Sequence, residues 1–239
     1  MGSAFRETAL PGKAEPAPLA GQPIGEFLAD LSSSASVPGG GAASALAGAI
    51  AANLVSMVAE LSVGRSKYEP YAATIEFGRA EGKRLGRVMT DLADADAAAF
   101  AGYMAASVMP RSTEAEVAAR KAALAAAAAD AIEPPRAMVA ACLEIATTCE
   151  RLAGRSNLGL ASDLVVAARL VEGAAHGAAE NVYVNLPALG DELRATFLET
   201  GTARGVRAVA RRAAAARALV AAKTLRDPES AAEPTGGAA

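Results

Sequence analysis

Apolar residues recur every three or four positions along most of this chain, and proline or glycine separates one such run from the next. This spacing is that of one helix face, so it predicts helices throughout. A short amphipathic helix is expected from Ile24 to about Leu31. Longer helices are expected at residues 42–61, 71–109, 113–132, 136–152, 160–185 and 191–225. The pattern therefore predicts an all-α fold, a single domain of five to six mostly long helices packed as a bundle.

The composition of the two chain ends sets the limits of the helical domain, and one proline pair sets a limit between two of its helices. Residues 1–22 and 227–239 are rich in Pro, Gly and Ala and contain no hydrophobic run, so we expect both segments to be disordered. Residues 23–226 form the predicted helical domain. The pair Pro134-Pro135 separates the third long helix from the fourth, either as a break or only as a kink.

The first long helix, residues 42–61, has two kinds of apolar face. A stripe of small residues lets another helix backbone approach closely; it consists of Gly41, Ala45, Gly48, Ala52, Ser56 and Ala59. Larger residues are expected to fill the core; they are Leu46, Ile50, Leu54, Met57 and Leu61. The helix approaches membrane-spanning length, but its polar residues favour the core helix of a soluble protein.

Composition narrows the class of protein. Apolar residues make up 52% of the chain and aromatic residues only 4%, because alanine supplies most of the apolar share. This favours closely packed helices. The net charge of −3 indicates neither nucleic acid nor a membrane as partner. Cys142 and Cys149 lie seven residues apart on one predicted helix, too far for a disulfide, so we expect free thiols in a reducing, cytoplasmic location.

Candidate chemistry begins at Pro38-Gly39-Gly40-Gly41, directly before the first long helix. Such a turn directs unpaired backbone N–H groups, at the positive end of a helix dipole, toward an electron-rich ligand. His176 is the only histidine, so a His-rich metal site is excluded, and any Ser-His-Asp catalytic array would have to use this residue. We expect no metal and no redox cofactor.

Several polar residues interrupt the apolar helices: Lys67, Tyr68, Asp96, Ser162, Asp163, Asn181 and Asn185. Singly, each could be a helix cap or a solvated side chain. Together they carry a resemblance to the cyclodeaminase/cyclohydrolase family, over about residues 24–191. The matching segments are Pro38-Gly39-Gly40-Gly41, Ser56-Met57-Val58-Ala59, Gly64-x-x-Lys67-Tyr68, Asp96-x-x-Ala99-Phe100, Pro110-Arg111-x-Thr113-x-x-Glu116, Asn157 with Ser162-Asp163, and Gly177-Ala178-x-x-Asn181-Val182-x-Val184-Asn185-Leu186.

This resemblance implies an all-α homodimer or higher homo-oligomer that acts on one-carbon units carried by tetrahydrofolate. The implied reaction is hydrolysis of 5,10-methenyltetrahydrofolate to 10-formyltetrahydrofolate. One alternative is formiminotetrahydrofolate cyclodeamination, with release of ammonia. The other is a non-catalytic folate-binding helical protein, an alternative supported by Glu60 and Ser66, because relatives usually carry Asn and Lys there.

The resemblance also implies roles for individual residues. Asp163 is the expected base, or the group that balances the substrate cation. Lys67 is the expected proton donor, or the group that stabilises the tetrahedral oxygen, with Tyr68 assisting. The expected substrate-binding residues are Pro38, Gly39, Gly40, Gly41, Arg65, Asp96, Ser162, Asn181 and Asn185. Among these, Arg65 is expected to meet the glutamate tail of the substrate.

Helix geometry adds one constraint to these assignments. In an unbroken helix over residues 160–185, Asp163 and Asn181 would lie roughly 27 Å apart along the axis. Either the helix breaks near Gly173 and Gly177, or two antiparallel protomers bring the two residues together. We expect the second arrangement, with the active site at or near a subunit interface.

Overall fold

A computed structural model describes residue 18 and residues 21–228 of the chain. The expected disorder of residues 1–17, 19–20 and 229–239 lies outside the described residues. The helices are α1 (Ile24–Leu31), α2 (Gly40–Glu60), α3 (Ala72–Ser107), α4 (Glu114–Leu152), α5 (Ala161–Tyr183) and α6 (Glu192–Ala221). Three short 3₁₀ helices join them: η2 (Ser66–Tyr71), η3 (Leu158–Leu160) and η4 (Leu186–Leu189). The described residues form no strand, so the predicted all-α class is confirmed.

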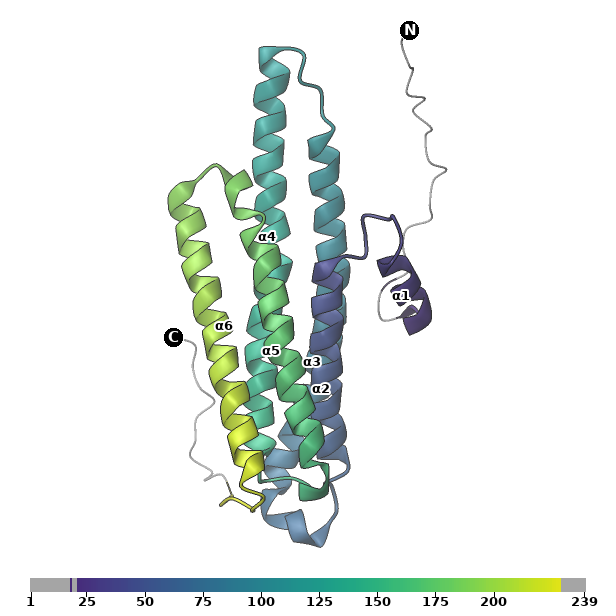
Figure 1. The fold of residues 1–239 in the computed structure, drawn as a ribbon, viewed down its shortest axis with the longest axis vertical. Coiled ribbons are helices and arrows are strands. Elements are labelled where there is room, and N and C mark those ends of the chain that lie inside the picture. Colours follow the sequence, from purple (N-terminus) through teal and green to yellow (C-terminus); the bar gives the residue numbers. More distant parts are fainter. Residues whose placement is uncertain (1–17, 19–20, 229–239) are drawn as a thin grey trace.

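The five long helices run side by side along the long axis of the molecule, and α1 lies outside them (Figure 1). Helix α2 packs against α3 and α5, while α4 contacts α3, α5 and α6. The hairpin of α3 and α4 extends beyond the other helices at one end (Figure 1). Thr113 and Glu116 form a capping box at the start of α4, where the loop of this hairpin ends.

Helix α4 corrects the expectation of two helices separated at Pro134-Pro135. It runs unbroken from Glu114 to Leu152 with both prolines inside it. Each proline lacks the N–H group that would bond the carbonyl one turn earlier. Both rings are buried between neighbouring helices. Tertiary packing therefore compensates for the lost hydrogen bonds and keeps the helix continuous.

Helix α2 confirms the close approach expected at its small residues and corrects the expectation that all its large residues fill the core. The small residues of the stripe are buried, whereas Ile50, Met57 and Leu61 are 44%, 37% and 44% exposed. The reason is the close approach of α3: a Cβ on Gly82 would lie 2.7 Å from the carbonyl oxygen of Ala52. Leu46 and Leu54 are partly buried against the core, as expected. The other large residues form an outer apolar face, which we define as Ile50, Met57 and Leu61.

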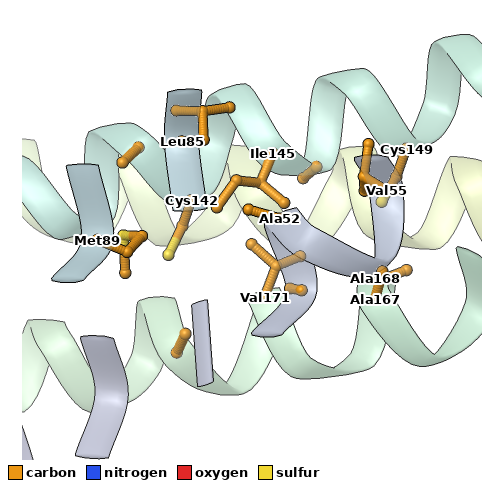
Figure 2. Packing of buried hydrophobic residues seen from close by; sticks show 14 of the residues in the cluster. Ala52, Val55, Leu85, Met89, Cys142, Ile145, Cys149, Ala167, Ala168 and Val171 are labelled. Carbon is orange, nitrogen blue, oxygen red and sulfur yellow. The ribbon is translucent and has the colours of Figure 1, made fainter. Parts of the chain in front are cut away.

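The core contains many small and medium side chains, and all five long helices contribute to it. Figure 2 shows these side chains meeting: Ala52, Val55, Leu85, Met89, Cys142, Ile145, Cys149, Ala167, Ala168 and Val171. Both thiols are free, as predicted, and burial raises the pKa of each to about 12. Among the described helices, α2 is long and apolar enough to cross a membrane, yet 61% of that stretch is buried inside the bundle.

Candidate functional site

The glycine turn opens α2 as the sequence predicts. The helix begins at Gly40, and its N-cap residue, Gly39, has an extended backbone and provides no side-chain cap. The carbonyl of Gly39 accepts the first helical hydrogen bond, from the N–H of Ala43. The N–H groups of the first turn therefore have no capping side chain, and the positive end of the helix dipole favours an anion or a polar ligand here.

A carboxyl group from α3 lies against this helix start. A Cβ built on Gly41 would be 2.7 Å from Cγ of Asp96, so only glycine leaves room for the carboxyl group. Asp96 is half-buried, and burial raises the pKa of its carboxyl above the ordinary value. A carboxyl group with a raised pKa exchanges protons closer to neutral pH, which is the property that acid–base catalysis requires.

Helix α5 brings two amide side chains to the same place. Nδ2 of Asn181 lies 3.8 Å from the position of a Cβ on Gly40. This amide donates to the carbonyl of Gly177, and Nδ2 of Asn185 donates to the carbonyl of Asn181. These bonds hold Asn181 along α5 and Asn185 just beyond the end of that helix at Tyr183. We call Gly40, Gly41, Asp96, Asn181 and Asn185 the glycine-turn group.

Ser44 lies beside the glycine-turn group, although the sequence pattern did not identify it as a site residue. Its hydroxyl donates to the carbonyl of Gly40, and a side chain on Gly177 would collide with it. The signal available in the sequence was a serine one turn into α2 together with a glycine one turn before Asn181. Recognising it required knowing that α2 and α5 cross at these two residues.

A second polar group lies at the opposite end of α2. The hydroxyl of Tyr68 accepts from the N–H of Leu158 at 3.2 Å and lies 3.4 Å from Oδ1 of Asn157. The hydroxyl of Ser62 accepts from the N–H of Asn157. Nζ of Lys67 lies 5.7 Å from the Tyr68 ring centroid. We call Ser62, Lys67, Tyr68 and Asn157 the tyrosine group.

Tyr68 ties η2 to η3 in this arrangement. Only 5% of the residue is exposed, and its hydroxyl is already engaged by the η3 segment. Ser162 and Asp163 lie in the first turn of α5, directly after η3. The tyrosine group therefore positions the start of α5, and with it Asp163.

Arg65 lines a cavity of about 210 Å³ beside this group. The walls of that cavity also include Tyr68 and two carboxylate residues, Glu69 and Glu76. A guanidinium and two carboxylates make the cavity mixed in charge. This cavity therefore attracts an anion more weakly than a cavity lined only by cations would.

The predicted site residues thus fall into two sets. Gly40, Gly41, Asp96, Asn181 and Asn185 gather at one end, next to Pro38 and Gly39, whereas Arg65, Lys67, Tyr68, Ser162 and Asp163 lie at the other. Helix α5 is continuous through Gly173 and Gly177, so the helix break considered from the sequence does not occur. Twenty residues of α2 separate the two ends by about 30 Å.

Glu60, at the end of α2, is compensated by two cations. Its Oε2 lies 3.1 Å from Nζ of Lys83 and 3.6 Å from Nη1 of Arg79. The hydrogen bond and charge of Lys83 lower the pKa of this carboxyl, with Arg79 adding to the effect. The negative charge introduced at position 60 is therefore neutralised within the protomer.

Similarity to known proteins identifies the class of enzyme to which this helical bundle belongs. The chain belongs to the formiminotransferase-cyclodeaminase family, whose sequence model matches residues 23–204. It is 38% identical over 168 residues to a methenyltetrahydrofolate cyclohydrolase from Methylorubrum extorquens, covering 70% of this chain and 81% of that protein. The chain is therefore an enzyme of the cyclohydrolase/cyclodeaminase type.

Two further similarities concern the cyclodeaminase. The formimidoyltransferase-cyclodeaminase of Sus scrofa is 33% identical over 176 residues, which cover 72% of this chain but only 32% of that protein. The chain thus spans about a third of the length of this larger relative. The crystal structure of formiminotetrahydrofolate cyclodeaminase from Thermotoga maritima superposes with a TM-score of 0.76 at 25% identity, covering 85% of this chain and 98% of that one.

Proposed function

We propose that this enzyme hydrolyses 5,10-methenyltetrahydrofolate to 10-formyltetrahydrofolate. The observation that carries the proposal is the Asp96 carboxyl, held against Gly41 with a raised pKa, while the amide of Asn181 lies against the neighbouring Gly40. The choice of hydrolysis follows the similarity to the cyclohydrolase, which extends over 81% of that protein. We also expect the enzyme to act in the cytoplasm, because its thiols are free.

Both protons of the attacking water leave its oxygen in this reaction; one is balanced by the proton delivered to N5, and the other is released. Water adds to the electrophilic amidinium carbon as a base takes its proton, which forms a C–O bond. The bond from that carbon to N5 then breaks as N5 receives a proton; the remaining hydroxyl proton passes to solvent as the C=O bond forms, and the formyl group stays on N10. We assign the base to Asp163 and the proton donor to Lys67, whose charge also stabilises the tetrahedral oxygen. Tyr68 assists by positioning, through its contacts to η3.

The remaining residues bind the substrate in this scheme. Asn181, Asn185 and Ser162 provide donors and acceptors for the edge of the pterin ring. The turn of Pro38, Gly39, Gly40 and Gly41 lets backbone N–H groups approach the substrate. Asp96, on α3 and packed against Gly41, balances the cationic amidinium or exchanges a proton with it. No metal or redox cofactor enters any of these steps.

We infer that the two ends meet across a homodimer. The glycine-turn group and the tyrosine group lie at opposite ends of α2, and the outer apolar face of α2 connects them. An antiparallel contact between two copies of this face would place each glycine-turn group beside the partner's tyrosine group. It would also cover exposed Ile50, Met57 and Leu61.

The activity test follows the near-ultraviolet absorbance of methenyltetrahydrofolate, in a buffer where spontaneous hydrolysis is slow. Purified protein should accelerate the decay, and Asp163→Asn and Lys67→Met should each abolish the acceleration. No acceleration by the wild-type protein would reject the cyclohydrolase. Ammonia release from formiminotetrahydrofolate would then support the second candidate, cyclodeamination, which the 98% coverage of the Thermotoga maritima enzyme favours.

Mixing two inactive variants tests the shared site. Lys67→Met and Asn181→Ala damage opposite ends, so a mixed dimer has one intact site and one doubly damaged site. Statistical exchange of subunits should restore about a quarter of wild-type activity. Lys67→Met mixed with Asp163→Asn is the matched control, because both changes damage the same end and no activity should return. An inactive first mixture, with subunit exchange verified, would place each complete site within one protomer.

A further inference from the structure

A second cavity lies near the glycine-turn group and has no role in the scheme above. It measures about 330 Å³ and lies between the end of α3, the start of α4 and η4. Its walls are formed by Tyr103, Arg111, Val117, Arg120, Lys121, Leu124 and Ala188. We call it the cationic cavity, because three of these residues carry a positive charge and none carries a negative one.

Two of the three cations have no ion pair. Neither Arg111 nor Lys121 is bonded to a carboxylate within the part of the chain that the structure describes, and both side chains are exposed. By contrast, several other arginine and lysine side chains of the bundle form ion pairs with a nearby glutamate, as Arg136 does with Glu133. Two unpaired positive charges at one cavity therefore attract an anion from solution.

The third cation is held in a fixed orientation. Nε and Nη2 of Arg120 both donate to the carbonyl of Ser107, at 3.2 and 2.9 Å. This anchors the guanidinium to the end of α3 without neutralising it. A planar group held in this way is suited to carboxylate oxygens, which it can meet with its outer N–H groups.

The cavity lies close to the amides of the glycine-turn group. Ala188 on its wall follows Asn185 by three residues, and the N–H of Ala188 donates to the carbonyl of Asn185 at 3.2 Å. One turn of 3₁₀ helix therefore spans the distance from Asn185 to the cavity, about 6 Å. The cavity beside Arg65 is less suitable for an anion, because Glu69 and Glu76 line it.

We propose that the cationic cavity binds the glutamyl carboxylates of the folate substrate, with Arg111 and Lys121 as the groups that recognise them. This rests on the proposed function, because a tetrahydrofolate bound at the glycine-turn group carries its carboxylates at the far end from its pterin ring. Arg120 supplies a fixed third contact, and Tyr103 and Val117 pack against the uncharged part of the tail. Additional γ-linked glutamates add carboxylates, so the cavity favours oligoglutamylated substrate.

Direct binding tests this proposal without any turnover. The probe is p-aminobenzoyl-triglutamate, which carries the tail but no pterin, and its affinity is measured by isothermal titration calorimetry. The variant Arg111→Gln/Lys121→Gln should weaken binding by about tenfold or more, and wild-type binding should weaken steeply with added salt. The matched control is Arg204→Gln/Arg211→Gln, which removes the same charge from α6 and should leave binding unchanged.

Kinetics with two substrates separate this proposal from the proposed function. For methenyltetrahydrofolate with three glutamates, the Arg111/Lys121 variant should have a raised KM and an unchanged kcat; the monoglutamate should respond less. Probe binding without any turnover would refute the cyclohydrolase and leave the cavity assignment standing. An Arg111/Lys121 variant that binds the probe as wild type does would overturn the assignment. Loss of binding in the α6 control or in Arg65→Gln alone would overturn it too, by moving the tail elsewhere.

Discussion

The carboxyl group of Asp96 occupies the space where a side chain on Gly41 would begin. A Cβ on Gly41 would be 2.7 Å from Cγ of Asp96, and α2 and α3 hold these residues in contact although 55 positions separate them. Glycine at the start of α2 thus serves two purposes: it leaves the helix N–H groups uncapped and admits a carboxyl group beside them.

Gly41→Ala should displace the Asp96 carboxyl and lower kcat/KM by about 100-fold, because small shifts of a catalytic or binding group are costly. The helix itself should survive, since alanine has the higher helix propensity. Activity and thermal unfolding measured together separate the two effects. Gly201→Ala, at a position with nothing within 4 Å, is the control; it should retain activity and gain up to about 1 kcal/mol of stability. If the Gly41→Ala variant kept wild-type activity, the position of the Asp96 carboxyl would not matter for catalysis, and Asp96 would not be a site residue.

Asp96 should make stability fall as pH rises through its titration. Burial raises the folded-state pKa above 3.8, so the folded protein keeps this proton at a pH where the unfolded chain has lost it. The stabilising effect of the proton is full below the unfolded-state pKa and is lost as pH passes the raised pKa.

Asp96→Asn removes this ionisation and should therefore be more stable than wild type at neutral pH, while the difference disappears below pH 3.8. Urea unfolding across a pH series measures this. Asp91→Asn, on the exposed side of the same helix, is the comparison variant. A difference between Asp96→Asn and wild type that did not change with pH would mean that the carboxyl ionises as it does in the unfolded chain.

Glu60→Asn should leave activity nearly unchanged. The charge of Glu60 is already compensated by Lys83 and Arg79, and the groups are about half exposed. We expect kcat/KM within about twofold of wild type, as is usual for exposed ion pairs. Glu60→Lys is the informative counterpart, because it would place a third positive charge beside Lys83 and should lower the melting temperature. A large gain in activity in Glu60→Asn would indicate that the carboxylate acts on the site.

Met57→Glu should convert the proposed dimer to monomers. The residue lies in the outer apolar face of α2 and is already 37% exposed, so a charge there costs the protomer little but opposes burial against a second copy. Light scattering should report half the molecular mass, together with loss of activity. Leu193→Glu, which replaces an 86% exposed side chain on α6, should change neither property. A dimeric and active Met57→Glu protein would exclude this face from the interface.

Helices, caps and turns were predictable because they depend on residues that are close together in the sequence. The spacing of apolar residues located the long helices, and the capping box of Thr113 and Glu116 marked the start of α4. Helix α2 ends at the C-cap residue Leu61, and Gly64, three residues later, has a positive φ of 69° that favours glycine there. The family resemblance likewise rested on motifs whose residues lie within a few positions of one another.

Other features depended on contacts between helices that the sequence separates widely. Burial of Pro134 and Pro135 kept α4 continuous, and the close approach of α3 turned several large residues of α2 outward. The cationic cavity combines Tyr103, Arg111 and Ala188, which no local pattern connects.

The sequence by itself determined the helices, their caps, the glycine turn and the family, since each depends on backbone preferences and spacing within one or two turns. Only the tertiary structure decided which face of α2 is buried, that Asp96 and Asn181 meet at Gly40 and Gly41, and that Asp163 lies at the other end. Those outcomes depend on which helices pack together and how closely. Helix approach is set by side-chain volumes summed over several elements at once, and the periodicity of one helix does not contain that information.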